Sequence, residues 1–278
     1  MMHSNLVSVS VERRGSVAEV TLSCPGKPGK ANTMGPDFWR EVPEVFADFD
    51  RDPGLRAILV RGSAGHFSYG LDLKTMGAEL ATHLTGPQLA DARTRLLDLI
   101  GEMQRAFRSI AACKKPVIAA ISGWCIGGGL DLISACDIRI ASADAKFSLR
   151  EVKLAMVADL GSLQRLPAII GEGRARDLAL TGRDIDADQA LGMGLVTQVF
   201  ASEETLFDEA RALAAQVAKN PPLVVQGIKQ VMNERLEKSV AEGLRHVALW
   251  NVAFLSSEDL QEALASFATR RAPEFKGR

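Results

Sequence analysis

Several residues and patterns that mark common enzyme classes are scarce in this chain of 278 residues. Tyrosine occurs once, at Tyr69, and Leu73 stands four positions on, where the usual short-chain dehydrogenase pair needs a lysine. Histidine occurs four times, and no histidine accompanies a G-x-S-x-G nucleophile elbow. The first absence disfavours a nicotinamide-dependent enzyme, and the second disfavours serine-hydrolase chemistry.

Cysteine is also scarce, and its placement argues against a cross-linked or zinc-bound fold. The thiols have apolar neighbours and no C-x-x-C spacing; they are Cys24, Cys113, Cys125 and Cys136. This favours free thiols in a reducing cytosol over disulfides or a zinc site. The N-terminal residues contain no signal-peptide core, and no run of about 20 apolar residues could span a bilayer. We therefore expect a soluble, cytoplasmic protein with no membrane partner and no metal.

The chain carries little net charge, −1 at pH 7, and its acids and bases are interspersed. A surface that binds nucleic acid through bulk positive charge is therefore not expected, and neither is a nucleic-acid partner. The hydrophobic content of 47% is enough for a large core, and the length permits one or two domains.

Strand and helix patterns alternate through the first 200 residues, and helical patterns fill almost all of the rest. The main strands are predicted at 6–11, 17–22, 57–61, 117–121, 137–141 and 145–149, and the main helices at 36–49, 91–112 and from about 162. This order predicts an α/β fold with a core over residues 1–200 that holds the active site. Residues 201–278 are predicted to form an appended helical region that mediates oligomer contacts.

The stretch 116–136, PVIAAISGWCIGGGLDLISAC, joins a buried strand to a helix through three consecutive glycines. Glycine lets a ligand approach the main chain closely, and the first N–H groups of a helix have no intrahelical partner. The junction therefore favours an anion or a developing oxyanion. Gly123, Gly127 and Gly129 also fit one form of a dinucleotide fingerprint, although the motif lies mid-chain rather than at a first βα turn.

A second glycine-bearing turn, GSAGHFSYGLDL at 62–73, follows another strand. If Gly70 and Leu71 meet Gly127 and Gly128 in space, one N–H from each turn would form a two-donor cradle for a carbonyl oxygen that becomes negative. The loss of one donor from such a hole typically costs on the order of 3 kcal/mol of transition-state stabilisation.

Three acids follow the glycines, and each has a structural as well as a catalytic interpretation. Asp131 can be a partner of the helix dipole, and Asp159 can be the N-cap of the helix that begins just after it. Glu151 can be an exposed turn residue or a partner of Arg150 or Lys153. Because Glu151 and Asp159 stand in a mostly apolar stretch, at least one of their pKa values should be perturbed.

Three separated motifs then carry a resemblance. The stretches HFSYGLDL, AAISGWCIGGGLDLISACDIRIAS and SLREVKLAMVADLGSLQRLPAIIG occur in the order and spacing of the crotonase, or enoyl-CoA hydratase/isomerase, superfamily. The resemblance runs from about residue 6 to the C-terminus. It implies a spiral core of ββα units, a helical trimerisation region, a homotrimer or hexamer, and acyl-CoA thioesters as substrates. It implies no cofactor, since CoA is part of the substrate.

The resemblance also implies roles for the two glycine turns. The amides of Leu71 and Gly128 would form an oxyanion hole for the thioester carbonyl. Residues expected to contact the substrate and its CoA moiety are Lys30, Ala31, Gly70, Asp72, Lys74 and Gly127.

Within the superfamily, Asp131, Glu151 and Asp159 look like the acidic trio of dienoyl-CoA isomerases, which convert 3,5-dienoyl-CoA to 2,4-dienoyl-CoA in fatty acid β-oxidation. Glu151 would handle the proton near the thioester and Asp159 the distal one, while Asp131 orients or biases the pair. An alternative is an enoyl-CoA hydratase, with Asp131 and Glu151 holding the water. A more distant alternative is a non-enzymatic binding protein on the same fold.

Overall fold

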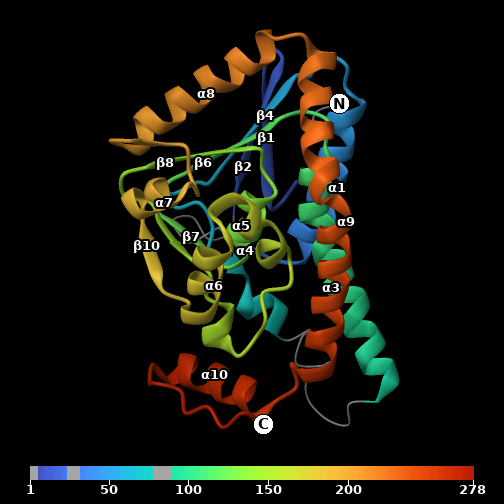
Figure 1. Ribbon diagram of the computed structural model, residues 1–278, viewed down its shortest axis with the longest axis vertical. Coiled ribbons are helices and arrows are strands. Elements are labelled where there is room, and N and C mark those ends of the chain that lie inside the picture. Colours follow the sequence, from blue (N-terminus) through green and yellow to red (C-terminus); the bar gives the residue numbers. More distant parts are fainter. Residues whose placement is uncertain (1–5, 24–31, 78–88) are drawn as a thin grey trace.

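The computed structural model describes residues 6–23, 32–77 and 89–278 (Figure 1). Among these residues a six-stranded sheet forms the centre, in the order β1-β2-β4-β6-β8-β11. Its strands are β1 (Val9–Arg14), β2 (Val17–Leu22), β4 (Ala57–Arg61), β6 (Val117–Ile121), β8 (Ile138–Ser142) and β11 (Gln198–Phe200). The first two form an antiparallel hairpin, in which β1 begins and ends three residues later than the strand predicted at 6–11, and the other neighbours pair in parallel.

Two smaller sheets lie beside the centre. One has the order β10 (Asp184–Asp186), β9 (Lys146–Ser148) and β7 (Trp124–Ile126), and the other pairs β3 (Thr33–Met34) with β5 (Gly70–Leu71). Of these strands only β9 was predicted, because runs of two or three residues are too short to show an alternating pattern. Their importance is positional, since β5 and β7 carry the two glycine turns.

The helices surround the sheets (Figure 1). They are α1 (Pro36–Arg51), α3 (Ala90–Ala112), α4 (Gly128–Ser134), α5 (Ser162–Ile170), α6 (Glu172–Thr181), α7 (Ala187–Met193), α8 (Glu203–Lys219), α9 (Pro222–Phe254) and α10 (Glu258–Thr269), with a short 3₁₀ helix η1 (Glu151–Leu154). The helix predicted at 36–49 begins at its proline, which is well suited to a first helical position.

The central strands bury both faces, and alternate side chains serve different cores. Ile58 and Val60 of β4 join the larger core with α1 and α3, whereas Leu59 points the other way. There it meets α8, whose Ala210 and Ala214 are fully buried and let the helix approach the sheet closely. The predicted division at residue 200 remains a prediction, but α8 packs on the sheet itself.

The long helix α9 runs alongside α3 and also contacts α5 (Figure 1). A partly buried ion pair ties it to the sheet, because Lys229 Nζ donates to Asp137 Oδ2 at 2.7 Å and to the Lys115 carbonyl at 3.1 Å. No helix among the described residues is both long and apolar enough to cross a membrane.

Candidate active site

The two glycine turns meet. A Cβ atom placed on Gly70 would lie 2.8 Å from Gly128 N, and one placed on Gly128 would lie 3.4 Å from Gly70 Cα and 3.8 Å from Leu71 N. Such a close approach needs glycine at position 70, where the φ of +75° also favours glycine, while a Cβ at position 128 would make ordinary contact with the backbone of the other turn. The structure therefore brings together two segments that are almost 60 residues apart in the sequence. This contact is the condition that a two-donor cradle requires.

Two backbone N–H groups lie next to each other at this contact. Asp72 N donates to Met34 O at 3.0 Å, and because successive N–H groups of a strand point to opposite sides, the Leu71 N–H points away from β3. Gly128 is the first residue of α4, so its N–H has no intrahelical acceptor. Neither strand pairing with β3 nor the helix α4 therefore uses these two donors.

Asp131 lies in the first turn of α4 and is 1% exposed. Its Oδ1 accepts a hydrogen bond from Ser162 N at 2.6 Å, so the carboxylate caps the start of α5 rather than the helix that carries it. Its Oδ2 is buried and has no hydrogen-bond partner among the described residues. Burial raises the pKa of Asp131, and the hydrogen bonds from Ser162 and the charge of Arg165 oppose that rise.

Glu151 begins η1 and lies against the glycine turn. Its Oε1 would stand 3.2 Å from a Cβ on Gly127, next to the Gly128 donor. Its Oε2 is buried without a hydrogen-bond partner in the described part of the chain. Arg150, a suggested partner, bonds Asp184 instead, with 2.8 Å to each carboxylate oxygen. Burial, then the charge of Asp131 and then that of Asp159, raise the pKa of Glu151.

Asp159 is not the N-cap of α5, since Gly161 holds that position. The Asp159 carboxylate turns instead toward α9, where Asn251 Nδ2 donates to Oδ2 at 2.7 Å. Burial raises the pKa of Asp159 to about 7; the Asn251 hydrogen bond opposes this, and the charge of Asp131 adds to it. The capping interpretation is therefore wrong.

These three carboxyl groups come from α4, η1 and the turn before α5, and they are close enough to influence one another's pKa. Like charges in a buried space do not all ionise readily, so near neutral pH the group retains protons that it can give as well as accept. Among the described residues, no set of three or more histidine, cysteine or acidic side chains is arranged to hold a metal.

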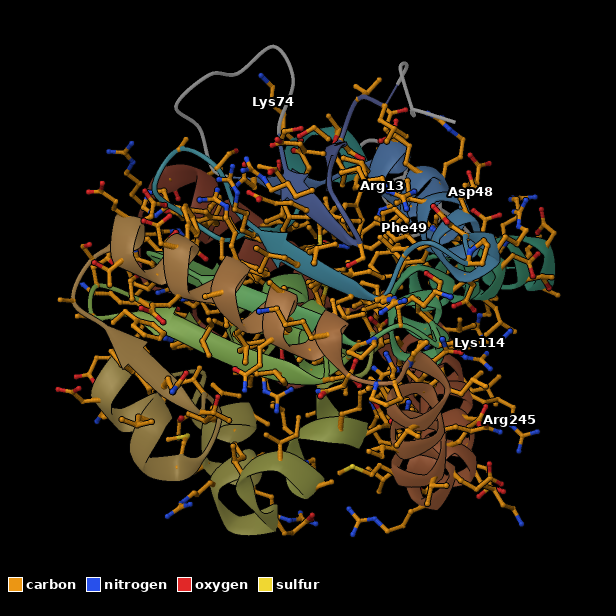
Figure 2. All side chains as sticks on the ribbon, turned by 90° about the horizontal axis from the view of Figure 1, so that it is seen from above. Arg13, Asp48, Phe49, Lys74, Lys114 and Arg245 are labelled. Atoms are coloured by element: carbon orange, nitrogen blue, oxygen red, sulfur yellow. The ribbon has the colours of Figure 1, made fainter. Side chains whose placement is uncertain are left out.

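The residues expected to contact CoA are less closely grouped than the three carboxyl groups. Asp72 uses its carboxylate locally, accepting from Thr33 Oγ1 at 3.2 Å and from Lys74 N at 3.1 Å. Lys74 is exposed, and Figure 2 shows its side chain at the surface of the molecule. Lys30 and Ala31 lie outside the described residues.

Two amide side chains at the site were not predicted. Gln104 of α3 donates to the Asp159 carbonyl at 2.8 Å and to the Leu244 carbonyl at 3.0 Å. Asn251 of α9 is 4% exposed. An amide within an otherwise apolar helical stripe is the signal that could have indicated both, because a buried amide must find hydrogen-bond partners.

Comparisons with known proteins agree with the resemblance that the three sequence motifs carry. A family model for enoyl-CoA hydratase/isomerase matches residues 12–278. The chain is 44% identical to a mitochondrial Delta(3,5)-Delta(2,4)-dienoyl-CoA isomerase of Dictyostelium discoideum, over 94% of this chain and 87% of that protein. It is 40% identical to a peroxisomal one of Arabidopsis thaliana, over 96% of each. A solved enoyl-CoA hydratase/isomerase from Pseudoalteromonas atlantica has a TM-score of 0.83 at 26% identity, over 97% of this chain and 100% of that one.

These relatives correct one expectation. The prediction of a cytoplasmic protein is wrong, because the two isomerase relatives are named as a mitochondrial and a peroxisomal protein. Free thiols and the lack of a long apolar run are equally compatible with the interior of these organelles. The features that suggested the cytoplasm therefore could not distinguish among the three compartments.

Proposed function

Because this chain belongs to the enoyl-CoA hydratase/isomerase family, we propose that it converts 3,5-dienoyl-CoA into 2,4-dienoyl-CoA. The supporting observation is the convergence of three carboxyl groups with raised pKa values beside two backbone donors. The two relatives named as dienoyl-CoA isomerases share 40–44% of their residues with it over most of its length.

The amides of Leu71 and Gly128 hold the thioester oxygen in this proposal. Removal of a C2 proton makes that oxygen an enolate, and two preorganised donors stabilise the new charge more than they stabilise the neutral carbonyl. The contact between the two glycine turns supports this role, since each donor comes from one turn.

Two carboxyl groups divide the proton transfers. Glu151 lies beside the glycine turn and takes the C2 proton; the electron pair of that C–H bond moves through the conjugated system, and C6 takes a proton from Asp159. The double bonds then stand at C2 and C4. Glu151 ends protonated and Asp159 ionised, so a proton must pass back before the next turnover. No cofactor is needed, because CoA is part of the substrate.

Asp131 biases this pair without contacting the reacting carbons. Its charge raises the pKa of both Glu151 and Asp159, so it helps to keep one proton between them at neutral pH. Its bond to Ser162 N also fixes the start of α5, three residues after Asp159.

One assay tests the function directly. The protein is incubated with 3,5-dienoyl-CoA and the absorbance of the conjugated 2,4-dienoyl thioester is followed. Wild type should form it; Asp159→Asn and Glu151→Gln should each lower kcat by roughly 100-fold or more, because each removes one proton carrier. If Asp159→Asn isomerises at the wild-type rate, the two-carboxylate mechanism is wrong.

Hydration of 2-enoyl-CoA is a second candidate activity. Asp131 Oδ2 and Glu151 Oε2 are both buried and lack partners among the described residues, so they offer two acceptors for a water molecule. Loss of the enoyl absorbance band measures this reaction. Hydration should survive in Asp159→Asn and fail in Glu151→Gln, and the opposite pattern would contradict this assignment.

We also propose a homotrimer or a pair of trimers. Apolar side chains are exposed along α9 and α10 in the single chain; they include Leu223, Val224, Ile228, Val231, Met232 and Phe267. So many exposed apolar side chains are more typical of a surface that another protein covers. Light scattering should give three or six times the chain mass, and a monomer would overturn this proposal.

We also propose contacts with the CoA moiety. Lys74 stands exposed three residues after Leu71, and Lys30 precedes β3, the strand that pairs with β5. Both amines could meet CoA phosphates, with Ala31 and Asp72 near the same moiety. Lys74→Ala should raise KM several-fold and leave kcat unchanged, because it removes a contact that is equal in substrate and transition state.

A further inference from the structure

One side chain from the C-terminal part of the chain reaches the carboxyl groups. Asn251 lies near the end of α9 and is 4% exposed. Its Nδ2 donates both to Asp159 Oδ2 at 2.7 Å and to the Val157 carbonyl at 2.9 Å. A single amide therefore holds the Asp159 carboxylate and the backbone two residues before it.

Other side chains fix the same turn. Gln104 of α3 donates to the Asp159 carbonyl at 2.8 Å, and Asp131 of α4 accepts from Ser162 N at 2.6 Å. The turn between η1 and α5 thus has partners on three helices. Only Asn251, however, bonds the Asp159 carboxylate itself among the contacts of the described residues.

We infer that Asn251 is a positioning residue for the distal proton transfer: it orients the Asp159 carboxyl group toward the far end of the bound acyl chain. This inference rests on the proposed isomerase function. Asn251 acts through Asp159 and does not touch Glu151, so its loss should impair the transfer at C6 and spare the transfer at C2.

The surroundings of Asp159 decide what a substitution of Asn251 does to its titration. The charged groups that act on it are Asp131 on α4 and Glu151 on η1, while Arg165 of α5 acts on Asp131. From α3 and α9 it meets the uncharged amides of Gln104 and Asn251. Since the Asn251 N–H group favours the ionised carboxylate, its removal raises the pKa of Asp159 further.

The test compares Asn251→Leu, which has a similar size but no donor, with Asn233→Leu. Asn233 lies on the same helix and its Nδ2 donates to the Ala111 carbonyl at 3.0 Å, away from the carboxyl groups. Two rates are measured for each variant. One is isomerisation of 3,5-dienoyl-CoA, and the other is exchange of the C2 protons of hexanoyl-CoA with deuterated water, which needs the C2 transfer but no transfer at C6.

Asn251→Leu should lower the kcat of isomerisation by roughly 10- to 100-fold, as misplacement of a catalytic group does, with KM changed less than about threefold. The alkaline limb of its pH–kcat profile should move up by roughly one pH unit, since a hydrogen bond to a charged group is lost. Exchange at C2 should stay within about threefold of wild type, a change that is small beside a 10- to 100-fold effect. Asn233→Leu should match wild type in all three.

An equal loss of isomerisation and exchange in Asn251→Leu would overturn the inference, because a general structural defect moves both. Unchanged isomerisation with an unchanged pH profile would also overturn it. If Asn251→Leu does not fold, Asn251→Gln keeps the donor and should retain most of the exchange and part of the isomerisation; equal losses there count against the inference in the same way. Failure of wild type to isomerise dienoyl-CoA would instead refute the proposed function.

Discussion

Burial, more than any single neighbour, sets the acidity of the three site carboxyl groups. Isomerisation needs one of Glu151 and Asp159 ionised and the other protonated. We expect a bell-shaped pH–kcat profile whose two limbs lie near the pKa values of the pair, about 7 and about 8; ionisation of the proton donor Asp159 causes the alkaline limb, and protonation of the base Glu151 causes the acid limb. Initial rates across the pH range measure it. An acid limb near pH 4, the value of an ordinary carboxyl group, would contradict the buried environment.

A carboxyl group with a raised pKa also affects stability. The unfolded chain releases the Asp159 proton near pH 4 and the folded protein near pH 7, so the folded state loses stability as the pH rises between these values. Asp159→Asn should therefore stabilise the protein above pH 7, by on the order of 1–4 kcal/mol, and have little effect below about pH 4. Urea unfolding at both ends of this range gives the difference, and a less stable variant at alkaline pH would refute it.

At the scale of single residues, the sequence indicated the acids but not their hydrogen-bond partners. Glu151 and Asp159 stood out as carboxyl groups in an apolar stretch, and their pKa values are raised as expected. The role of Asn251 could not be predicted, because its partner lies 92 positions earlier and only the packing of α9 brings them together.

At the scale of elements, the contact between β5 and α4 depends on glycine. A Cβ on Gly70 would stand 2.8 Å from both Gly128 N and Ile126 O, at a φ of +75°. Gly70→Ala should push the two donors apart and lower kcat/KM by roughly 100-fold. Gly65→Ala is the matched control, since Gly65 has a φ of +78° and open space around its Cβ position. Equal kcat/KM losses in both variants would show that backbone strain alone is responsible.

Elements were predictable where the pattern was long. The strands at 57–61 and 117–121 were predicted with the bounds that the structure has, and the helix at 91–112 was predicted to within a residue. The two-residue strands β3 and β5 were not, because they form only when the chain brings them side by side. The meeting of the glycine turns was raised from the sequence only as a condition, since nothing in it fixes distances across the fold.

At the scale of the whole molecule, the predicted α/β fold of the crotonase type with a helical C-terminal region is confirmed. The attachment of that region can be tested at Lys229, which is 7% exposed and bonds Asp137 on the sheet side. Lys229→Met should lower the free energy of unfolding by about 1–3 kcal/mol, because a partly buried carboxylate loses its cation. Denaturant unfolding measures it, with the exposed Lys238→Met as a control that should change little.

The position of Asn251 near the C-terminal end of α9 has a consequence for how an active molecule arises. A ribosome must release the chain as far as residue 251 before the Asp159 carboxyl group can find its amide partner. A nascent or prematurely terminated polypeptide that stops before this point can already contain the glycine turns and all three acids. We expect such a product to remain catalytically immature, so that competence is acquired late in translation rather than gradually along it.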